Sequence, residues 1–582
     1  MLLKNKKEFY SRHMLYASLF PSFVSALALA LADIADAVVV GTKIGENGLA
    51  AIGIVTPVYM IYNILGYGLS VGGVVTHSRL VASGRDGEAN RHFQLLLWTS
   101  VFCGLAMAAL GLAFHRQFLF LLGLGEQDNA LLELCEDYYL PLVAAAPLFI
   151  ANFILYDLVR SDGDPNLASI SFSIGCVFDL ILNILLVLFL DRGVSGSIAA
   201  TIIAQAVSLL IALLHFVKKK GILRLSKPQI GIGECLRDFE TGAASSISYL
   251  FQFLFLALAN NLLMRHGGGT LYVAVFDVVM NVSFVVYALF QGTGAAIQPL
   301  VSALYEEKDK PALLHTLKSG IRWGMACGAA VTILIGMFAK QVAELFGLHD
   351  PMSLATAVPA IQIFCTSVPL AGVMLILIAY YQSVDQEKLS ATLTLVRSFF
   401  VLLPLTLLLG LMDMEHFWLV FPLTETLSLG VTVLLVKGRG KGRVLVDVPV
   451  LSAALDNDNQ GLADLLDSAE NFCKANGAGA YQASLARMAL EELCLVIIDK
   501  AFTGDEREYI QVTLIAEKDG RFTLHIRSRA ERFNPFDMRM GKIRQGDEED
   551  FLDSVGVMVI KKRAEKFYYR RNSIFNVLTV VI

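Results

Sequence analysis

The chain has 582 residues, of which 55% are hydrophobic and 17% are charged, and its mean hydropathy is +0.60. This composition is too apolar for a soluble protein of several domains and indicates a protein that is embedded in a membrane. The 47 Lys and Arg residues are outnumbered by 52 Asp and Glu residues, so no global basic field exists and nucleic acid is excluded as a partner.

Apolar runs long enough to cross a bilayer, about 20 residues each, follow one another through most of the chain. We expect helices, because backbone polar groups in lipid must be satisfied within the segment. The twelve expected spans are, within several residues, about 14–41, 49–77, 93–114, 137–159, 167–190, 194–217, 240–265, 271–302, 321–340, 353–382, 389–412 and 416–437.

Lys and Arg residues gather at alternate ends of these spans, which sets their orientation. They precede the first span and follow the second, fourth, sixth and twelfth, whereas the segment after the third span is rich in Asp and Glu. The basic ends are therefore expected in the cytoplasm, and both termini with them. The expected location is the cell membrane, with many passes.

The two halves of the apolar region resemble each other. The stretch GYGLSVGGVVTHSRLVASGRDGEA (66–89) is similar to GTGAAIQPLVSALYEEKDKPA (292–312), and LLGLGEQD (121–128) is similar to LFGLHDPM (345–352). Both matches have an offset of about 225 residues, which predicts two repeats of six spans in the same orientation. Paired six-helix bundles with a site between them are typical of transporters.

Carboxylates within the first half need a functional or structural reason, since an acid at the bilayer centre costs about 2.5–3.5 kcal/mol. Asp33 and Asp36 lie three residues apart on the first span, Asp179 and Asn183 lie four apart on the fifth, and Thr201 lies on the sixth. Their oxygens suit H⁺ or an alkali cation. Two interpretations stay open, ion coupling and hydrogen bonds between helices; coupling is favoured for Asp36 and Asp179.

In the second half, Asp277 and Asn281 share one helical face and are candidates for the wall of a cavity. Glu425, on the last span, either faces the cavity as well or pairs with a loop or with Arg397. We favour the pairing.

Residues 12–440 resemble the MATE (multidrug and toxic compound extrusion) family of transporters. The residues that carry the resemblance are ADAVVVGTKIGENGLAAIGIVTPV (35–58), the stretch 66–89, LVRSDGDPNLA (158–168) and DLILNILLVLFLDRGVSGSIAATIIAQ (179–205). The resemblance implies two six-helix lobes around a cavity that opens alternately to each side. It also implies export of amphiphilic, often cationic organic compounds, driven by entry of H⁺ or Na⁺.

The family's cation site implies roles for four residues. Asp36 and Thr201 match it directly, whereas Asp179 and Asn183 stand in exchanged positions on the fifth helix, where the family has Asn and then Asp. These four residues are the expected site for H⁺ or Na⁺. Some members carry a Glu on the seventh helix; Gln252 lies near that position and is a cavity candidate, together with Asp33, Asp277 and Asn281.

The last part of the chain has the composition of a soluble α/β segment. We expect a strand in GRVLVDVPV (442–450), helices at 458–475, 481–502 and 550–566, a hairpin around Asp519-Gly520 and a final strand in FNVLTVVI (575–582).

This segment resembles the ATP-binding domain of anti-sigma-factor kinases, in the GHKL or Bergerat-fold group. The resemblance rests on ALEELCLVIIDKAF (489–502), IRSRAERFNPF (526–536) and GVMVIKKRAEKFYYRR (556–571). The family needs an Asn four residues after its Glu to hold Mg²⁺, but Val496 stands four residues after Glu492. We therefore expect a degenerate domain that binds a regulatory protein or senses a signal and does not hydrolyse ATP.

The expected fold is an all-α membrane protein of twelve helices in two lobes, plus a small α/β cytoplasmic domain. Its parts are 12–217, the linker 218–239, 240–440 and 445–582. The expected function is a secondary active exporter, not an enzyme, with small amphiphilic organic substrates, membrane lipid as its surroundings and no cofactor besides the coupling ion. A lipid-linked oligosaccharide flippase and a membrane-anchored signalling kinase are the alternatives.

Overall fold

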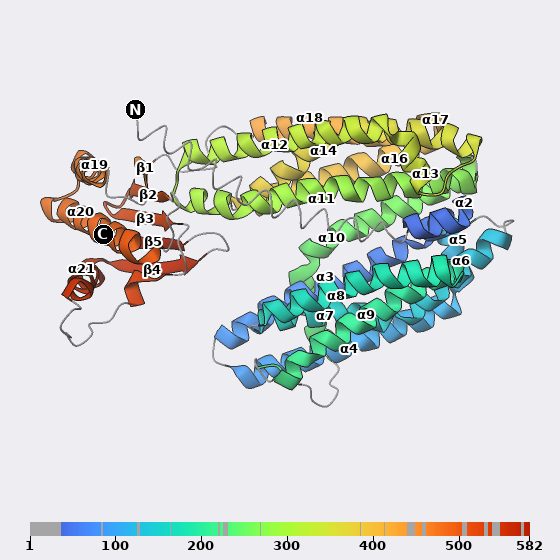
Figure 1. Cartoon of the computed structure of the whole chain (residues 1–582), viewed down its shortest axis with the longest axis horizontal. Coiled ribbons are helices and arrows are strands. Elements are labelled where there is room, and N and C mark those ends of the chain that lie inside the picture. The colour runs from blue at the N-terminus through green and yellow to red at the C-terminus, as the bar shows by residue number, and fades with distance from the viewer. Residues whose placement is uncertain are drawn as a thin grey trace.

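The structure is a computed structural model of the whole chain. The residues that it describes are 37–82, 85–124, 129–162, 164–218, 222–224, 231–267, 269–384, 386–412, 414–438, 448–456, 461–502, 509–528, 533–537, 548–571 and 576–582. Within these ranges the chain forms two helix bundles and a separate domain of mixed helices and strands (Figure 1).

The amino-terminal lobe contains the helices that follow a helical stretch at 37–44. They are α2 (Glu46–Val55), α3 (Pro57–Ala82), α4 (Asp86–Ala113), α5 (His115–Leu122), α6 (Asn129–Ala144), α7 (Ala146–Ser161), α8 (Pro165–Asn183), the π-helical segment η1 (Ile184–Phe189) and α9 (Gly193–Lys218).

The carboxyl-terminal lobe repeats this arrangement. Its elements are α10 (Ile232–Leu262), the π-helical segment η2 (Leu263–Gly267), α11 (Thr270–Glu306), α12 (Lys310–Met337), α13 (Ala339–Leu345), α14 (Pro351–Ser383), α15 (Glu387–Leu395), the π-helical segment η3 (Val396–Val401), α16 (Leu402–Met412), α17 (Met414–Phe417) and α18 (Val420–Gly438).

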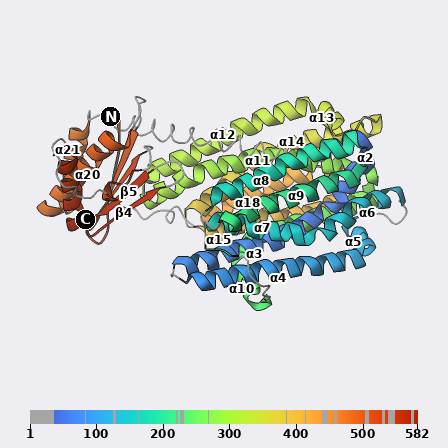
Figure 2. The same ribbon diagram turned by 60° about the horizontal axis from the view of Figure 1, so that its bottom comes forward.

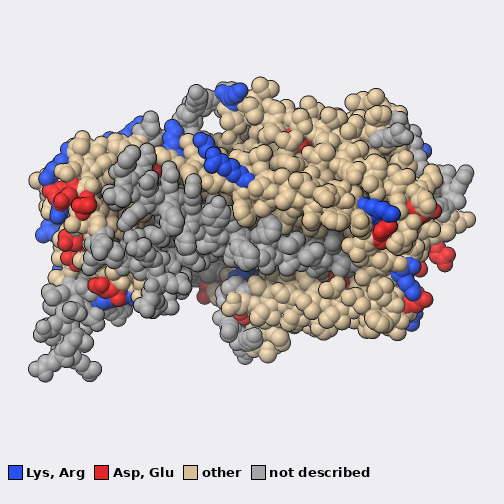
Figure 3. All heavy atoms as spheres, turned by 45° about the horizontal axis from the view of Figure 1, so that its top comes forward, with Lys and Arg blue, Asp and Glu red and all other residues tan. Residues whose placement is uncertain are grey.

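Ten helices of the described residues are long and apolar enough to cross a membrane, or eleven when the bent pair α6 and α7 counts as one span. These eleven correspond to the second to twelfth expected spans. The first expected span, about 14–41, lies outside the described residues except for its last few. On the face that Figure 3 shows, most charged groups lie toward the two ends, and the tan surface between them carries few. Large apolar side chains on these helices, such as Leu210 on α9 and Leu407 on α16, are exposed, which suits contact with lipid.

The two lobes meet at the end that lies away from the mixed domain, and their helices diverge toward that domain (Figure 1). Gly347, after α13, has a positive φ of 84°, and a Cβ added to it would lie 1.8 Å from the backbone oxygen of Gly41. In the other lobe Gly123 has a φ of 122°, and a Cβ added to it would lie 2.9 Å from the backbone carbon of Asn260 of α10. Each lobe therefore inserts a glycine turn against the other, and glycine is required because a side chain would collide there.

Helix α10 belongs to both lobes. Its first half crosses α3 so closely that a Cβ on Gly242 would lie 2.0 Å from the backbone oxygen of Gly68, and one on Gly72 would lie 1.8 Å from that of Asp238. Its second half packs against α16 and η3. Paired glycines let two helix backbones approach closely, so this crossing joins α10 to the amino-terminal lobe.

The carboxyl-terminal domain is an antiparallel sheet covered by helices on one face. Its elements are β1 (Val450–Asp456), α19 (Leu462–Ala475), α20 (Ala480–Ala501), β2 (Tyr509–Ala516), β3 (Phe522–Ser528), the 3₁₀ turn η4 (Pro535–Asp537), α21 (Glu548–Arg563), β4 (Lys566–Arg571) and β5 (Asn576–Val581). The strand order is β1-β2-β3-β5-β4. Figure 2 shows the helices on one side of the sheet.

The sequence predicted most of this domain. The hairpin around Asp519-Gly520 is present, and Gly520 has the positive φ of 85° that a tight turn uses. Strand β1 begins at Val450, the last residue of the predicted strand, and residues 442–447 of that prediction lie outside the described residues. Strand β4 was not predicted, because its sequence KFYYRR has charges at both ends.

Candidate functional site

A cavity of about 460 Å³ lies within the carboxyl-terminal lobe. Its walls come from α10, α11, α14, α18 and the segment α15–η3. Helix α11 supplies Met280, Ser283, Tyr287 and Gln291, which recur every three or four residues and so share one helical face. The volume is in the range of pockets that hold drug-sized molecules.

An ion pair forms part of the cavity wall. Nε of Arg397 lies 2.9 Å and 3.1 Å from the two carboxylate oxygens of Glu425, and its Nη2 lies 2.5 Å from Oε1. Arg397 also lies over the ring of Tyr287, with 5.4 Å between guanidinium carbon and ring centroid. The predicted pairing of Glu425 with Arg397 is therefore confirmed. A bidentate pair of this kind holds two charges inside the lobe without leaving either one unpaired.

The accessible part of this pair belongs to the arginine. The side chain of Glu425 is 3% exposed and that of Arg397 is 17% exposed. Arg397 lies in the π-helical segment η3, and such segments widen a helix locally and are frequent at functional sites. The equivalent span of the first lobe has its own π-helical segment, η1, directly after Asn183.

Aromatic side chains form a substantial part of the cavity wall. Tyr249, Phe255, Phe284 and Phe421 line it, and Phe255 and Phe421 contact each other edge to face. Aromatic faces bind apolar surface and attract cations, so the cavity combines apolar walls with a few polar groups. That chemistry fits an amphiphilic organic compound.

The structure separates the cavity candidates of the second half. Gln252 lines the carboxyl-lobe cavity. Asp277 and Asn281 do not line it; Nδ2 of Asn281 donates to the Asp277 carboxylate at 3.0 Å, and Asp277 packs against Gly53 of α2. Their position is thus between the lobes, at the end where the lobes meet. Asp33 lies outside the described residues.

Three of the four predicted cation ligands lie in the described part of the amino-terminal lobe. Asp179 and Asn183 stand one turn apart on α8, which packs along α9, the helix that carries Thr201. Asn183 is fully buried and Thr201 is 8% exposed. The fourth, Asp36, lies outside the described residues, so the assignment of H⁺ or Na⁺ to these four side chains stays a prediction.

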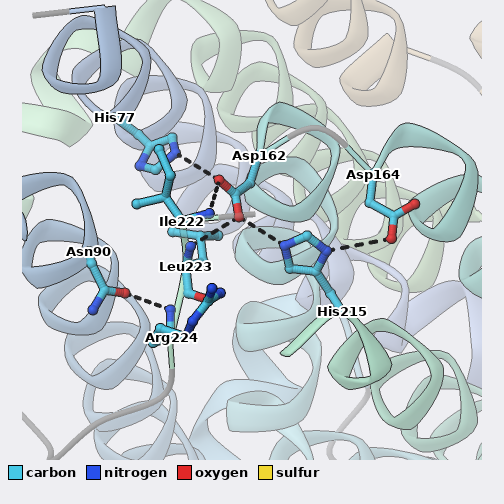
Figure 4. Close-up of polar contacts among 8 residues, drawn as sticks. All are labelled: His77, Asn90, Asp162, Asp164, His215, Ile222, Leu223 and Arg224. Carbon is cyan, nitrogen blue, oxygen red and sulfur yellow. Dashed lines mark hydrogen bonds and ion pairs between the residues drawn. The ribbon is translucent and has the colours of Figure 1, made fainter. Parts of the chain in front are cut away.

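A buried cluster of acids and histidines lies where the α7–α8 loop of the same lobe meets the carboxyl end of α9, and it was not predicted from the sequence (Figure 4). Oδ2 of Asp162 lies 2.8 Å from Nε2 of His215, and Oδ1 lies 3.9 Å from Nε2 of His77. On the other side of His215, Nδ1 lies 3.6 Å from Asp164. All four side chains are nearly inaccessible to solvent.

Asp162 also fixes the linker between the lobes. Its two oxygens accept the backbone N–H groups of Ile222 and Leu223 at 3.0 Å each. The next residue, Arg224, donates its backbone N–H to Asn90 at 2.6 Å. The loop between α7 and α8 therefore holds the linker against the amino-terminal lobe.

A second buried contact joins α10 to that lobe. Asp238 lies 2.7 Å from Nε2 of His92 and accepts a hydrogen bond from Thr76 at 2.7 Å. Its side chain is 4% exposed, and that of His92 is 8% exposed. Two histidine–aspartate contacts, His215–Asp162 and His92–Asp238, thus stabilise the region where the linker and α10 pack against the amino-terminal lobe. A signal was present in the sequence, since Asp162 and Asp164 belong to the motif LVRSDGDPNLA.

Comparisons with known proteins agree with this architecture. The model of the MatE family matches twice, at residues 21–185 and 244–408, with an offset close to the one seen between the sequence repeats. The model of the histidine kinase-like ATPase domain matches residues 455–582.

Curated relatives cover most of the membrane part. An FAD transporter of Shewanella oneidensis is 24% identical over 423 residues, which are 70% of this chain and 90% of that protein. The multidrug export protein MepA of Staphylococcus aureus is 24% identical over 409 residues, 68% of this chain and 86% of that protein.

Solved structures share the fold. The inward-facing conformation of a multidrug resistance MATE family transporter of the MOP superfamily aligns with a TM-score of 0.64 and 23% identity, covering 72% of this chain and 97% of that one. The outward-facing conformation of such a transporter aligns with a TM-score of 0.55 and 22% identity, covering 74% and 96%. The two family matches together span more than half of the chain. The chain therefore belongs to the MatE family of membrane transporters and carries a histidine kinase-like ATPase domain at its carboxyl end.

Proposed function

We propose that the protein exports amphiphilic organic compounds, many of them cationic, across the cell membrane in exchange for H⁺ or Na⁺. The observation that carries the proposal is the cavity of the carboxyl-terminal lobe, whose aromatic walls surround the pair Arg397–Glu425. The relatives named as multidrug export proteins support the same substrate class. Both termini lie in the cytoplasm in this proposal.

Coupling is proposed to take place in the amino-terminal lobe, at Asp36, Asp179, Asn183 and Thr201. Binding of H⁺ or Na⁺ there stabilises one conformation of this lobe, and the substrate stabilises the other. Ion and substrate then drive each other because each has a different affinity for the two states. No step of this scheme uses ATP.

The carboxyl-terminal domain is proposed to regulate transport without hydrolysing ATP. Val496 stands at the position of the family's metal-binding Asn, and its side chain is 1% exposed within the apolar core of the domain. An apolar side chain cannot ligate Mg²⁺. A fluorescent ATP analogue added to the purified full chain tests this, and saturable binding followed by phosphate release would contradict it.

The transport proposal is tested in proteoliposomes with a fluorescent cationic dye, under H⁺ and Na⁺ gradients imposed separately. The wild type is compared with Asp36→Asn and Asp179→Asn, and FAD serves as an anionic test compound. We expect dye movement with one gradient and loss of that movement in both variants. Dye movement that persists in both variants would contradict the coupling site, and absence of movement under either gradient would contradict the exporter.

A further inference from the structure

The two faces of the sheet in the carboxyl-terminal domain differ in chemistry. One face carries Val512, Leu514 and Ile526, which pack with the helices in the core of the domain. The opposite face carries Thr513 and Arg527, together with Gln511, His525 and Thr579. A polar sheet face usually lies in water, yet these five residues are between 0% and 7% exposed. Polar groups buried in this way need partners, so part of the protein must cover this face.

The turn between α11 and α12 supplies such partners. Oε2 of Glu307 accepts a hydrogen bond from Thr513 at 2.9 Å, and Oε1 forms an ion pair with Nη2 of Arg527. Nη1 of the same arginine donates to Gln511 at 3.4 Å. Lys308, the next residue of the turn, forms an ion pair with Glu517 at the end of β2. Figures 1 and 2 both show the sheet against the ends of α11 and α12.

The pair Glu307–Arg527 is buried on both sides. The side chain of Glu307 is 2% exposed and that of Arg527 is 1% exposed. Removing one partner of a buried ion pair leaves the other charge in a poorly solvated place, which is costly. Docking of the domain therefore requires both charges, because Glu307 or Arg527 buried without its partner would destabilise the docked arrangement.

The backbone of the turn between α11 and α12 orients Glu307 toward the carboxyl-terminal domain. Lys308 has a left-handed backbone conformation with a φ of 53°, which is uncommon for a residue other than glycine. The next residue, Asp309, caps α12 by accepting the N–H of Ala312 at 3.2 Å. A capped helix on one side and a continuous helix on the other hold the turn in one shape.

Helix α11 connects this turn with the cavity. It is one helix of 37 residues, Thr270–Glu306, and it carries Met280, Ser283 and Tyr287 in the cavity wall. Tyr287 lies about 30 Å from the turn, at a rise of about 1.5 Å per residue. Because α11 is continuous, it is the physical connection through which a displacement at Glu307 is expected to act on the cavity wall.

We propose that the carboxyl-terminal domain regulates transport through this contact. Docking of the polar sheet face on Glu307 and Lys308 stabilises the conformation of the carboxyl-terminal lobe that is described here, and release of the domain allows the lobe to leave it. The partner that binds this surface is thus a segment of the same chain, the turn between α11 and α12 with its acidic Glu307 and basic Lys308. The inference rests on the proposed transport function only where transport is the readout.

A charge reversal tests the proposal in the full chain. Glu307→Arg and Arg527→Glu each place two like charges in the contact, whereas the double variant restores opposite charges. The matched control is Arg521→Glu, an exposed arginine of the same domain that pairs with Asp519. The readouts are amide hydrogen exchange of β2 and β3, exchange in residues 280–291 of α11, and dye transport in proteoliposomes.

We expect each single reversal to raise exchange in β2, β3 and residues 280–291 at least tenfold and to raise the transport rate at least threefold. The double variant is expected to return all three readouts toward the wild type, and the control is expected to change none of them. Unchanged exchange in β2 and β3 in both single variants would overturn docking. Increased exchange there, with unchanged transport and unchanged exchange in residues 280–291, would overturn regulation through α11.

Failure of the transport proposal is distinguishable from failure of this one. If the wild type moves no dye under either gradient, the exporter is contradicted, and the regulatory inference is then decided by exchange in residues 280–291. Recovery of the protection of these residues in the double variant supports the inference, and absence of recovery overturns it.

Discussion

Arg397 and Glu425, on neighbouring helices of the carboxyl-terminal lobe, share a bidentate ion pair in the wall of a cavity that is otherwise mostly aromatic and apolar. Because the two charges neutralise each other, their separate removal and their joint removal have different consequences. A single change leaves one buried charge without its partner, whereas a joint change leaves none.

We therefore predict that Glu425→Gln lowers the free energy of unfolding by about 3–5 kcal/mol, the range measured when one partner of a buried pair is removed. The double variant Arg397→Met/Glu425→Met is expected to recover most of this loss. Thermal unfolding of the purified protein in detergent measures both. A double variant that is less stable than the single one would show that the pair itself is strongly stabilising.

Asp162 makes a second testable contact, because its two oxygens are both occupied. Oδ1 accepts the N–H of Ile222, and Oδ2 accepts that of Leu223 and also contacts His215. In Asp162→Asn one oxygen becomes an NH₂ group, which cannot accept, so at least one buried N–H loses its partner at a cost of about 1–3 kcal/mol. Release of the linker is expected to follow.

The measurement is the rate of tryptic cleavage at the three lysines 218–220, next to the fixed residues. We expect Asp162→Asn to raise this rate at least fivefold at pH 7.5, the factor that corresponds to about 1 kcal/mol. Asp191→Asn is the control, since Asp191 makes an exposed ion pair with Lys43. Equal cleavage of the two variants would contradict the role of Asp162 in holding the linker.

Two thiols report on the fold of the carboxyl-terminal domain. Burial raises the pKa of Cys494 to about 12 and that of Cys473 to about 11, from an ordinary value of 9.0. Because the folded state keeps the proton more tightly, the contribution of these groups to stability is complete below pH 9.0 and is lost as the pH rises through the raised values.

We expect that neither thiol reacts with a maleimide at pH 8 in the native protein and that both react after unfolding in guanidinium, as read by mass spectrometry of tryptic peptides. Modification of native Cys494 as fast as that of an unfolded control would contradict its burial. The stability of the domain is also expected to fall between pH 9.0 and about 12.

The glycine crossing between α3 and α10 leads to a further prediction. Gly72→Ala places a Cβ 1.8 Å from the backbone oxygen of Asp238, and backbone cannot move aside as a side chain does. We expect a loss of about 1–3 kcal/mol or more in stability, the usual effect of overpacking. Gly233→Ala, in the first turn of α10 with no atom within 4 Å, is the matched control and is expected to be neutral or stabilising. Thermal unfolding of both variants measures these changes, and equal stability of the two would contradict the close approach at Gly72.

The sequence contained the membrane architecture because hydropathy and spacing are local properties. Hydropathy predicted the eleven spans that the described residues contain. The pairing of Arg397 with Glu425 was predicted because both are charged residues in otherwise apolar helices. The cluster around Asp162 could not be predicted in the same way. Its partners lie 53 and 60 residues further along the chain, and their meeting depends on how α7, α9 and the linker pack.

In the carboxyl-terminal domain, too, local features were predictable from the sequence and long-range contacts were not. The hairpin β2–β3 has a turn signal and alternating side chains, so the sequence predicts it, whereas the predicted strand 442–450 meets β1 only at Val450 and lies otherwise mostly outside the described residues. The docking of Arg527 on Glu307 joins residues 220 apart, and no local pattern indicates it.

The placement of the α3–α10 crossing limits the kinds of motion that the lobes can make. The backbones of α3 and α10 touch only where glycines lie in the contact, so one helix can tilt about this point. It cannot slide along its own axis, because a residue with a Cβ would then enter the contact. The crossing therefore behaves as a fulcrum. Tilting by about 10° would move the ends of a helix as long as α3, at about 1.5 Å of rise per residue, by only a few ångströms in opposite directions. Opening of one side of the protein and closing of the other would then be a single movement.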